Sequence, residues 1–244
     1  MTKKRIFITG SSRGIGYGLA KMFISGGHEV IINSNNIKNL KLASKKLNNC
    51  DYVLGDVCDL ISVKKIVRKI KNNKKKLDVI ICNYGNSNPK KNDLNFEHAI
   101  KHNFYSTTNI VSEGVSLLNK NEGKIICISS ICGVEVIENA PIGYSLAKSL
   151  INNYVKSMSK PLGEKGISIN AIAPGNILFD GSVWDKKIKE NKNKTLNYIN
   201  KVVPLKKFGT IQDIFEICEI IVKNRSQYMS GATYVLDGAQ TNKF

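Results

Sequence analysis

The 244-residue chain lacks any apolar run approaching the ~18 residues that a membrane-spanning helix needs. Its first apolar stretch, Ile6 to Ile8, has neither the length nor the small-residue cleavage site of a secretory signal. Proline is scarce, and no Pro-, Gly- or Ser-rich linker divides the chain. These absences predict a single domain spanning residues 1–244, a cytoplasmic location and no membrane partner.

The cysteine spacing of common metal sites is also absent, because the six cysteines include no C-x-x-C pair. Several of them, such as Cys82 and Cys127, lie within apolar, strand-like runs, where a free thiol behaves as a small hydrophobic group. The composition therefore predicts a reducing compartment, free cysteines and no metal site.

Acidic residues are few, since 19 Asp and Glu stand against 37 Lys and Arg, for a formal net charge of +18. Such an excess raises nucleic acid, an anionic membrane or a phosphorylated substrate as a partner. The charge is mostly lysine mixed with asparagine, as in residues 71–76, without interleaved aromatic residues to stack on bases. Solvated helix faces are the favoured interpretation, and no nucleic-acid partner is expected.

Short runs rich in β-branched residues alternate with longer stretches of helical spacing, a pattern typical of a parallel sheet covered on both faces. With right-handed crossovers it predicts an α/β Rossmann fold, a doubly wound seven-stranded parallel sheet. The predicted strands span residues 4–9, 29–34, 51–55, 77–82, 123–129, 167–172 and 232–236. The predicted helices span residues 14–26, 36–48, 59–72, 95–119, 143–163 and 210–223.

Residues 176–205 interrupt this alternation with a long, lysine-rich insert after Ala173-Pro174-Gly175. An excursion of this length at the carboxyl end of a strand is often a lid over a site. The insert holds the only tryptophan, Trp184, among several lysines. Such a set suits an anionic substrate, namely a phosphorylated, nucleotide-linked or carrier-linked one, and equally suits a hydrophobic anchor on a solvated helix.

The run from Thr9 to Gly16 follows the first strand and opens the first helix. There, unpaired backbone N–H groups and the helix dipole favour a pyrophosphate. Gly10 permits the turn, Gly14 lets phosphates approach the backbone, and Gly16 lets the helix pack on the strand. In this strand–turn–helix context the glycines predict a dinucleotide site.

The cofactor is expected to be NADP(H) rather than NAD(H). The second strand ends in Ile32-Asn33-Ser34-Asn35-Asn36, with no carboxylate to bind a ribose 2′-OH. Arg13 in the glycine turn is placed to pair with the 2′-phosphate of NADP(H). Ser34 and Asn35 are neutral and discriminate poorly between this phosphate and the 2′-OH of NAD(H). Asp56, after the third strand, either holds the adenine amino group or caps its own loop.

Tyr144 and Lys148 are spaced i, i+4, so on a helix both side chains project from one face. The unperturbed pKa of a tyrosine is about 10, and a nearby ammonium and an oxidised nicotinamide both lower it, which makes the phenol usable as a general acid or base. The fifth strand ends in Ser129-Ser130, and one of these hydroxyls is expected to face the crevice and bind a substrate oxygen.

In order and spacing, these pieces resemble the classical short-chain dehydrogenase/reductase family over essentially the whole chain. The matching pieces are Thr9-Gly10-x-x-x-Gly14-x-Gly16, Asp56-Val57, Asn103, Ser130-x-x-Gly133, Tyr144-x-x-x-Lys148, Pro174-Gly175 and Val235-Leu236-Asp237-Gly238. The resemblance implies a Rossmann fold, a homo-oligomer (tetramer or dimer) and a four-residue catalytic set.

By this resemblance Ser130 orients the substrate oxygen, Tyr144 exchanges its proton, Lys148 lowers the tyrosine pKa and holds the nicotinamide ribose, and Asn103 anchors a water. Ser130 is preferred to Ser129 because it precedes Ile131-Cys132-Gly133 as the family serine precedes its glycine. The implied cofactor-binding residues are Gly10, Ser12, Arg13, Gly14, Ile15, Gly16, Ser34, Asn35, Asp56, Val57, Asn83, Gly85, Tyr144, Lys148, Pro174, Gly175 and Ile177.

Two departures from the family pattern stand out. Cys82-Asn83-Tyr84-Gly85 places a large phenol, Tyr84, where the family has a small residue, and this ring either shapes the substrate pocket or packs outward. After Pro174-Gly175, residues 176–184 lack the threonine that the family often offers to the nicotinamide carboxamide. His102, beside Asn103, is interpreted as a structural side chain.

The implied function is an NAD(P)(H)-dependent oxidoreductase that interconverts a carbonyl and a secondary alcohol by hydride transfer. The cofactor half resembles reductases of 3-oxoacyl thioesters, whereas the insert is more similar to members associated with surface sugars, including nucleotide-sugars. A noncatalytic NADP(H)-binding regulator is the alternative. The presence of Ser130, Tyr144 and Lys148 together favours the enzyme, because a sensor has no need of all three.

Overall fold

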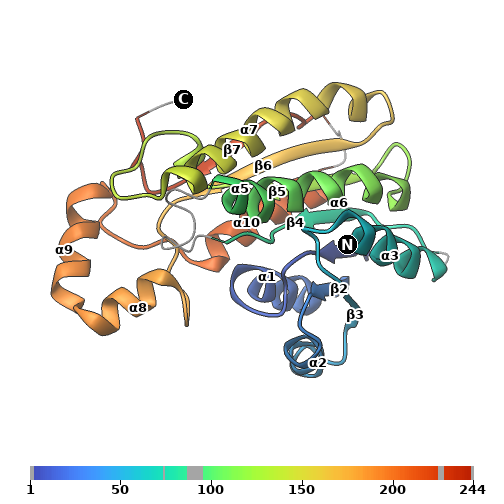
Figure 1. The fold of residues 1–244 in the computed structure, drawn as a ribbon, viewed down its shortest axis with the longest axis horizontal. Coiled ribbons are helices and arrows are strands. Elements are labelled where there is room, and N and C mark those ends of the chain that lie inside the picture. The colour runs from blue at the N-terminus through green and yellow to red at the C-terminus, as the bar shows by residue number, and fades with distance from the viewer. Residues whose placement is uncertain (1–2, 74, 87–95, 225–227, 243–244) are drawn as a thin grey trace.

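The computed structural model describes residues 3–73, 75–86, 96–224 and 228–242, and these residues form an α/β fold around one parallel sheet (Figure 1). The strand order is β3-β2-β1-β4-β5-β6-β7, with every neighbouring pair parallel. The doubly wound, seven-stranded prediction is therefore confirmed. The strands are β1 (Arg5–Ile8), β2 (Glu29–Ser34), β3 (Asp51–Leu54), β4 (Val79–Cys82), β5 (Lys124–Ile128), β6 (Ser168–Pro174) and β7 (Thr233–Leu236).

Helices cover both faces of the sheet because successive strand side chains point to opposite faces. In β1, Ile6 and Ile8 pack on one side and Phe7 on the other, and all three are almost fully buried. The Ile6 side is covered by α1 (Gly14–Ser25), α2 (Ile37–Lys46) and α10 (Ile211–Lys223). The Phe7 side is covered by α3 (Leu60–Asn72), α6 (Ser106–Gly114) and α7 (Ile142–Gly163).

The helix expected over residues 95–119 is divided, and its first residue lies outside the described part of the chain. It contains α5 (Phe96–Ile100), a π-helical turn η1 (Lys101–Tyr105), α6 and a 3₁₀ turn η2 (Val115–Leu117). The wider turn is stabilised by Asn103, whose Nδ2 donates to the carbonyl oxygen of Ala99 at 3.0 Å. A polar side chain thus replaces a regular helical hydrogen bond at a position predicted to be functional.

The predicted insert is a pair of helices, α8 (Val183–Glu190) and α9 (Lys192–Val202), which stand beyond the carboxyl end of β6 (Figure 1). At its base, the backbone N–H of Leu178 donates to the carbonyl of Gly209, and that of Gly209 donates to the carbonyl of Asn176. We call the segment between these bonds, residues 178–208, the lid.

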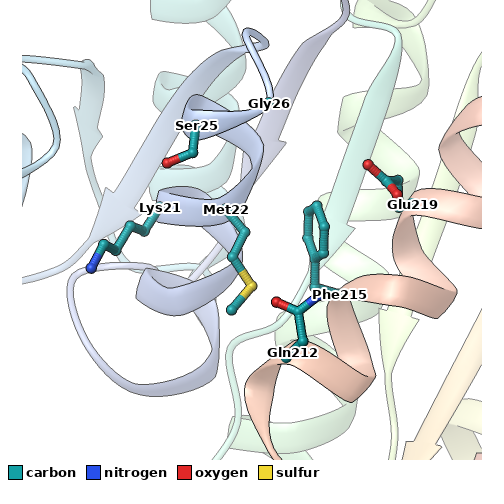
Figure 2. A pocket seen from close by; sticks show the side chains of 7 residues that line it. All are labelled: Lys21, Met22, Ser25, Gly26, Gln212, Phe215 and Glu219. Carbon is teal, nitrogen blue, oxygen red and sulfur yellow. The ribbon is translucent and has the colours of Figure 1, made fainter.

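An open groove lies between α1 and α10, where Met22 and Phe215 face each other between Lys21 and Glu219 (Figure 2). It contains none of the predicted site residues. Among the described residues, no helix combines the length and apolarity needed to cross a membrane. All six cysteines are free thiols, and Cys82 lies directly opposite Cys127 in the register of β4 and β5.

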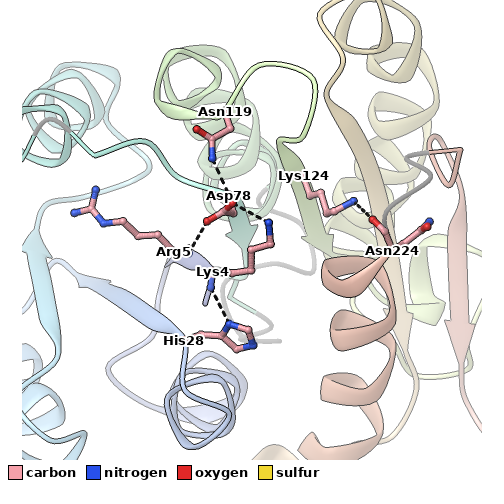
Figure 3. A network of polar contacts seen from close by, with 7 residues as sticks. All are labelled: Lys4, Arg5, His28, Asp78, Asn119, Lys124 and Asn224. Atoms are coloured by element: carbon pink, nitrogen blue, oxygen red, sulfur yellow. Dashed lines mark hydrogen bonds and ion pairs between the residues drawn. The ribbon is translucent and has the colours of Figure 1, made fainter. Parts of the chain in front are cut away.

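The amino end of the sheet is held by Asp78, which precedes β4 (Figure 3). Its carboxylate accepts hydrogen bonds from the backbone N–H of Arg5 at 2.7 Å, from Lys4 Nζ at 3.1 Å and from Asn119 Nδ2 at 3.3 Å. Nearby, buried Lys124 donates from Nζ to the carbonyl of Asn224 at 2.7 Å, and burial lowers the pKa of this lysine.

Replacing Asp78 with alanine should lower the free energy of unfolding by about 2 kcal/mol, because the partly buried donors of Lys4 and Arg5 would lose their charged acceptor. Urea denaturation followed by circular dichroism measures the loss. Glu164→Ala, at an exposed carboxylate after α7, is the matched control and should change stability by less than about 0.5 kcal/mol. Equal stabilities of the two variants would contradict the anchoring role of Asp78.

Candidate active site

The glycine turn is held against the end of β4 by hydrogen bonds. Asn83 Nδ2 donates to the carbonyl oxygens of Thr9 at 3.0 Å and Gly10 at 3.1 Å, and the Asn83 backbone N–H donates to Thr9 Oγ1 at 3.0 Å. A side chain at Gly16 would clash with the amide of Asn83, so the close packing expected at that glycine is present. These contacts therefore fix the position of the glycine turn relative to β4.

The N-terminus of α1 fits an anionic ligand. Gly14, its first residue, has a φ of +61°, which an L side chain rarely adopts. Among the described residues, no side chain caps the helix at Arg13, and the first turn contains no acidic residue. Its leading N–H groups and dipole therefore face outward without a competing carboxylate, which is the donor set that a pyrophosphate requires.

The end of β2 has the neutral character expected from the sequence. Ser34 Oγ accepts from the backbone N–H of Asn36 at 3.2 Å, while Asn35 and the Arg13 side chain are exposed. Asp56 uses Oδ1 to accept from the backbone N–H of Cys58 at 2.9 Å. Loop capping, one of the two interpretations of Asp56, is thus present.

The two serines after β5 point in different directions. Ser129 Oγ donates to the backbone carbonyl of Lys148 at 3.2 Å and is directed into α7. Ser130 Oγ accepts from the Cys132 backbone N–H at 3.2 Å, and the Ser130 side chain also makes a hydrogen bond with the Tyr144 side chain. The structure brings Ser130, rather than Ser129, to the phenol.

Lys148 lies beneath the Tyr144 ring, with Nζ 5.6 Å from the ring centroid. It is almost fully buried, and Nζ donates to the carbonyl of Ile128 at 2.8 Å. Burial lowers the pKa of Lys148 to about 8. Burial also raises the pKa of Tyr144, assisted by the nearby Cys132 thiol, so in this environment the net shift is opposite to the one expected from the i, i+4 ammonium.

Gly85 leaves room for the side chains of Asn103 and Lys148 to approach each other. A Cβ at Gly85 would lie 2.9 Å from Asn103 Oδ1 and 3.4 Å from Lys148 Nζ, so the two side chains approach the same small space. Asn103 is fully buried, and its amide also makes two hydrogen bonds with the backbone of Asn86, at 2.9 and 3.0 Å. Asn103 thus stabilises the π-helical turn and borders the lysine at the same time.

The remaining predicted residues gather at the same edge of the sheet. Gly175 follows β6, and its N–H donates to the carbonyl of Leu236 at 2.9 Å. The buried Ile177 pairs with Gly209 at the base of the lid. Ser12 and Ile15 are half-buried in and beside the glycine turn, whereas Val57 and Pro174 are buried.

Three contacts were missed by sequence reasoning. Tyr84 packs against the core, and its hydroxyl lies 2.9 Å from His102 Nδ1, which is also 3.5 Å from Cys58 Sγ. Cys132 adjoins Ser130 and Tyr144, and Phe179 of the lid packs on Gly14. The large residue at Tyr84 and the Ser-x-Cys-Gly spacing were visible signals, but nothing in the sequence indicated the Phe179 contact.

Trp184 packs within the lid. Its ring stacks on Tyr198 of α9 and meets Phe208, each at a centroid distance of 5.5 Å, and Lys187 Nζ lies 4.6 Å from the Trp184 ring. The tryptophan therefore joins α8, α9 and the segment after α9 into one small aromatic core, as the hydrophobic-anchor interpretation requires.

Comparison with known proteins decides the family. A family model described as enoyl-(acyl carrier protein) reductase matches residues 10–241. The chain belongs to the short-chain dehydrogenase/reductase family. This short-chain dehydrogenase/reductase is 26% identical to the oxidoreductase UcpA of Salmonella typhimurium, over 99% of this chain and 95% of that one. It is 31% identical to the 3-oxoacyl-[acyl-carrier-protein] reductase FabG of Chlamydia muridarum, over 98% and 97% of the two chains.

Solved structures agree with the fold. L-sorbose reductase from Gluconobacter frateurii, complexed with NADPH and L-sorbose, superposes with a TM-score of 0.88 at 21% identity, over 100% of this chain and 98% of that one. Membership of the short-chain dehydrogenase/reductase family makes this protein an oxidoreductase.

The buried Lys148 should reduce stability at neutral pH. Its folded pKa of about 8 lies below the unfolded value of 10.5, so the unfolded chain binds more protons between these values and stability rises with pH across that window. Lys148→Met should therefore raise the free energy of unfolding at pH 7 by about 1–2 kcal/mol, after allowing for the hydrogen bond lost by Ile128. The gain should shrink towards pH 10.

Urea denaturation at both pH values tests this expectation. Lys156→Met replaces an exposed lysine on the same helix, and it should show no such pH-dependent difference. A Lys148→Met protein less stable than the wild type at pH 7 would mean that burial of the ammonium does not destabilise the folded protein.

Proposed function

We propose that this protein is an NADP(H)-dependent oxidoreductase that interconverts a carbonyl and a secondary alcohol, with Tyr144 as the general acid and base. The observation that carries the proposal is the meeting of Ser130, Tyr144, Lys148 and Asn103 at the carboxyl edge of the sheet. The uncapped N-terminus of α1 lies at the same edge. Ligands of doubly wound sheets bind there.

The residues of this edge divide the cofactor between them. Gly14, Ile15 and Gly16 would bind the pyrophosphate, with Gly10 and Ser12 shaping the turn. Arg13, Ser34 and Asn35 would bind the 2′-phosphate, and Asp56, Val57 and Asn83 the adenosine. Gly85, Tyr144 and Lys148 would hold the nicotinamide ribose, and Pro174, Gly175 and Ile177 would contact the nicotinamide. NADP(H), when bound, supplies or accepts the hydride.

Side chains of the protein bind the substrate oxygen and transfer the proton to it. Ser130 donates a hydrogen bond to the substrate oxygen, where negative charge develops during reduction. Burial raises the pKa of Tyr144, which keeps the phenol protonated at neutral pH and ready to give its proton to that oxygen. Lys148, whose pKa is about 8, remains mostly charged at neutral pH and stabilises the phenolate that is left. By the family resemblance, Asn103 would anchor a water through which a proton from solvent returns to the Tyr144 phenolate.

Two substrate classes follow from the relatives. FabG of Chlamydia muridarum is named for a 3-oxoacyl carrier-protein substrate, and the Gluconobacter frateurii enzyme for L-sorbose. The exposed lid lysines favour an anionic or carrier-linked carbonyl compound over a neutral sugar. These lysines are Lys186, Lys187, Lys189, Lys192, Lys194, Lys201, Lys206 and Lys207.

A homo-oligomer in the cytoplasm, tetramer or dimer, belongs to the same proposal. Ile142, Leu146 and Leu150 recur every four residues on α7 and are at least 40% exposed. An apolar stripe of this kind is a surface that a second copy of the chain would cover.

Tyr144→Phe should reduce turnover by about 10²–10⁴-fold, because it removes the proton donor and leaves the ring in place. The activity is measured as NADPH or NADH oxidation with a panel of 3-oxoacyl thioesters and keto-sugars. NADPH affinity, measured by calorimetry, should change by less than about threefold. Tyr154→Phe, on the same helix, is the control and should keep its activity. Undiminished turnover of every accepted substrate by Tyr144→Phe would refute the catalytic assignment and support a noncatalytic regulator.

Arg13→Ala should weaken NADPH binding about tenfold while leaving NADH binding within about twofold, because only NADPH carries the 2′-phosphate. Calorimetric titration with each dinucleotide measures the two affinities. Lys21→Ala removes a positive charge from the outward face of α1 and should affect neither affinity. Equal losses for the two dinucleotides would show that Arg13 does not read the phosphate.

A further inference from the structure

The ring of Phe179, which belongs to the lid, covers the first residue of α1. A Cβ placed on Gly14 would lie 3.4 Å from Phe179 Cε2 and 3.6 Å from Cζ. These ring carbons are the nearest atoms to that face of Gly14. An apolar side chain therefore lies beside the first residue of the uncapped helix α1.

The backbone around Phe179 connects the ring to the start of α8. The Phe179 N–H donates to Ser182 Oγ at 3.4 Å, and the Ser182 N–H donates to the Phe179 carbonyl at 3.0 Å. Ser182 also caps α8, because its Oγ accepts from the Asp185 N–H at 3.0 Å. Movement of the ring by more than a rotamer change therefore displaces the first turn of α8.

A pyrophosphate and the Phe179 ring compete for one space. The missing side chain at Gly14 is what would allow phosphates close to the backbone, and the Phe179 ring lies within van der Waals distance of the position that this side chain would fill. Benzene carbons accept no hydrogen bond of consequence from the N–H groups of the turn, whereas phosphate oxygens do. The ring is instead held by packing, half-buried against the core cluster that includes α1 and α10.

We propose that Phe179 is a plug in the phosphate site: NADP(H) binds only when the ring leaves Gly14, and its departure moves the start of the lid. The proposal rests on the cofactor site proposed above. In this scheme the start of the lid moves when the cofactor binds, before the substrate binds. The apparent affinity for cofactor is then lowered by the fraction of molecules in which the plug is in place.

Trp184 offers a direct readout of this movement. It is the only tryptophan of the chain and lies on α8, two residues after Ser182. Its ring is stacked on Tyr198 and tilted against Phe208, so a displacement of the first turn of α8 changes its surroundings. NADP⁺ is the suitable probe, because it lacks the near-ultraviolet absorption through which NADPH would quench tryptophan directly.

The test compares NADP⁺ binding to the wild-type protein and to Phe179→Ala by calorimetry and by stopped-flow tryptophan fluorescence. Phe179→Ala should bind about tenfold more tightly and associate faster, since loss of a half-buried ring removes the competing packing. The wild type should show a change in Trp184 emission on binding, and Phe179→Ala should lose most of it.

Two further variants keep the test decisive. Val183→Ala removes a side chain that is 48% exposed on the same helix, and it should keep both the affinity and the signal of the wild type. Phe179→Leu preserves more of the packing, and its affinity for NADP⁺ should lie between those of the wild type and Phe179→Ala. This variant provides the test if Phe179→Ala folds poorly.

Equal or weaker binding by Phe179→Ala and Phe179→Leu would overturn the plug while leaving the cofactor proposal intact, because it would place the ring beside the bound phosphates instead of in their way. Absence of binding to wild type and variants alike, with both NADP⁺ and NADPH, would overturn the cofactor proposal and the plug together.

Discussion

Burial of the Lys148 ammonium at the carboxyl end of β5 is the constraint on which the site depends. A buried positive charge is unfavourable unless donors and acceptors around it are fixed. Here the carbonyl of Ile128 accepts from Nζ, and the absence of a side chain at Gly85 leaves room for Nζ beside Asn103. Gly133 lets the backbone of α7 approach, since any Cβ there would clash with the backbone of Lys148. The glycines therefore position the lysine as much as its helix does.

The fold could be predicted from the sequence because its signal is local. The five central strands, β2, β1, β4, β5 and β6, are short runs of mostly buried residues rich in isoleucine and valine, whereas the edge strands β3 and β7 are more exposed. The glycine turn, Ser130 and Gly175 follow closely after strands. Since all seven strands are parallel, their carboxyl ends meet at one edge, and spacing alone brought the glycine turn, Ser130 and Tyr144 to that edge. The π-helical turn at Lys101–Tyr105 escaped prediction, because it depends on Asn103 reaching the backbone of Ala99 and Asn86 in the folded state.

The sequence spacing did not predict the directions of the pKa shifts in the site. The i, i+4 separation of Tyr144 and Lys148 correctly placed the two side chains together, yet burial decides the direction of both pKa shifts. Burial depends on packing from η3 (Ile131–Gly133), the element that precedes α7, and from the π-helical turn, which lies before β5 in the sequence. The same reason explains Tyr84, whose partner His102 is reached only after β4 and α5 have packed together.

The lid illustrates how a segment with little burial can still behave as a unit. α8 has no buried residue and α9 has two, Thr195 and Ile199, so these two helices gain little from the main core, whereas Phe179 and Val203 attach the two ends of the lid. The helices are held together by the contacts of Trp184 with Tyr198 and Phe208. Two helices that pack on each other and are little buried elsewhere can move as one body at small energetic cost. The exposed lysines keep this body solvated, so electrostatic attraction to an anionic ligand adds to a motion that packing already permits.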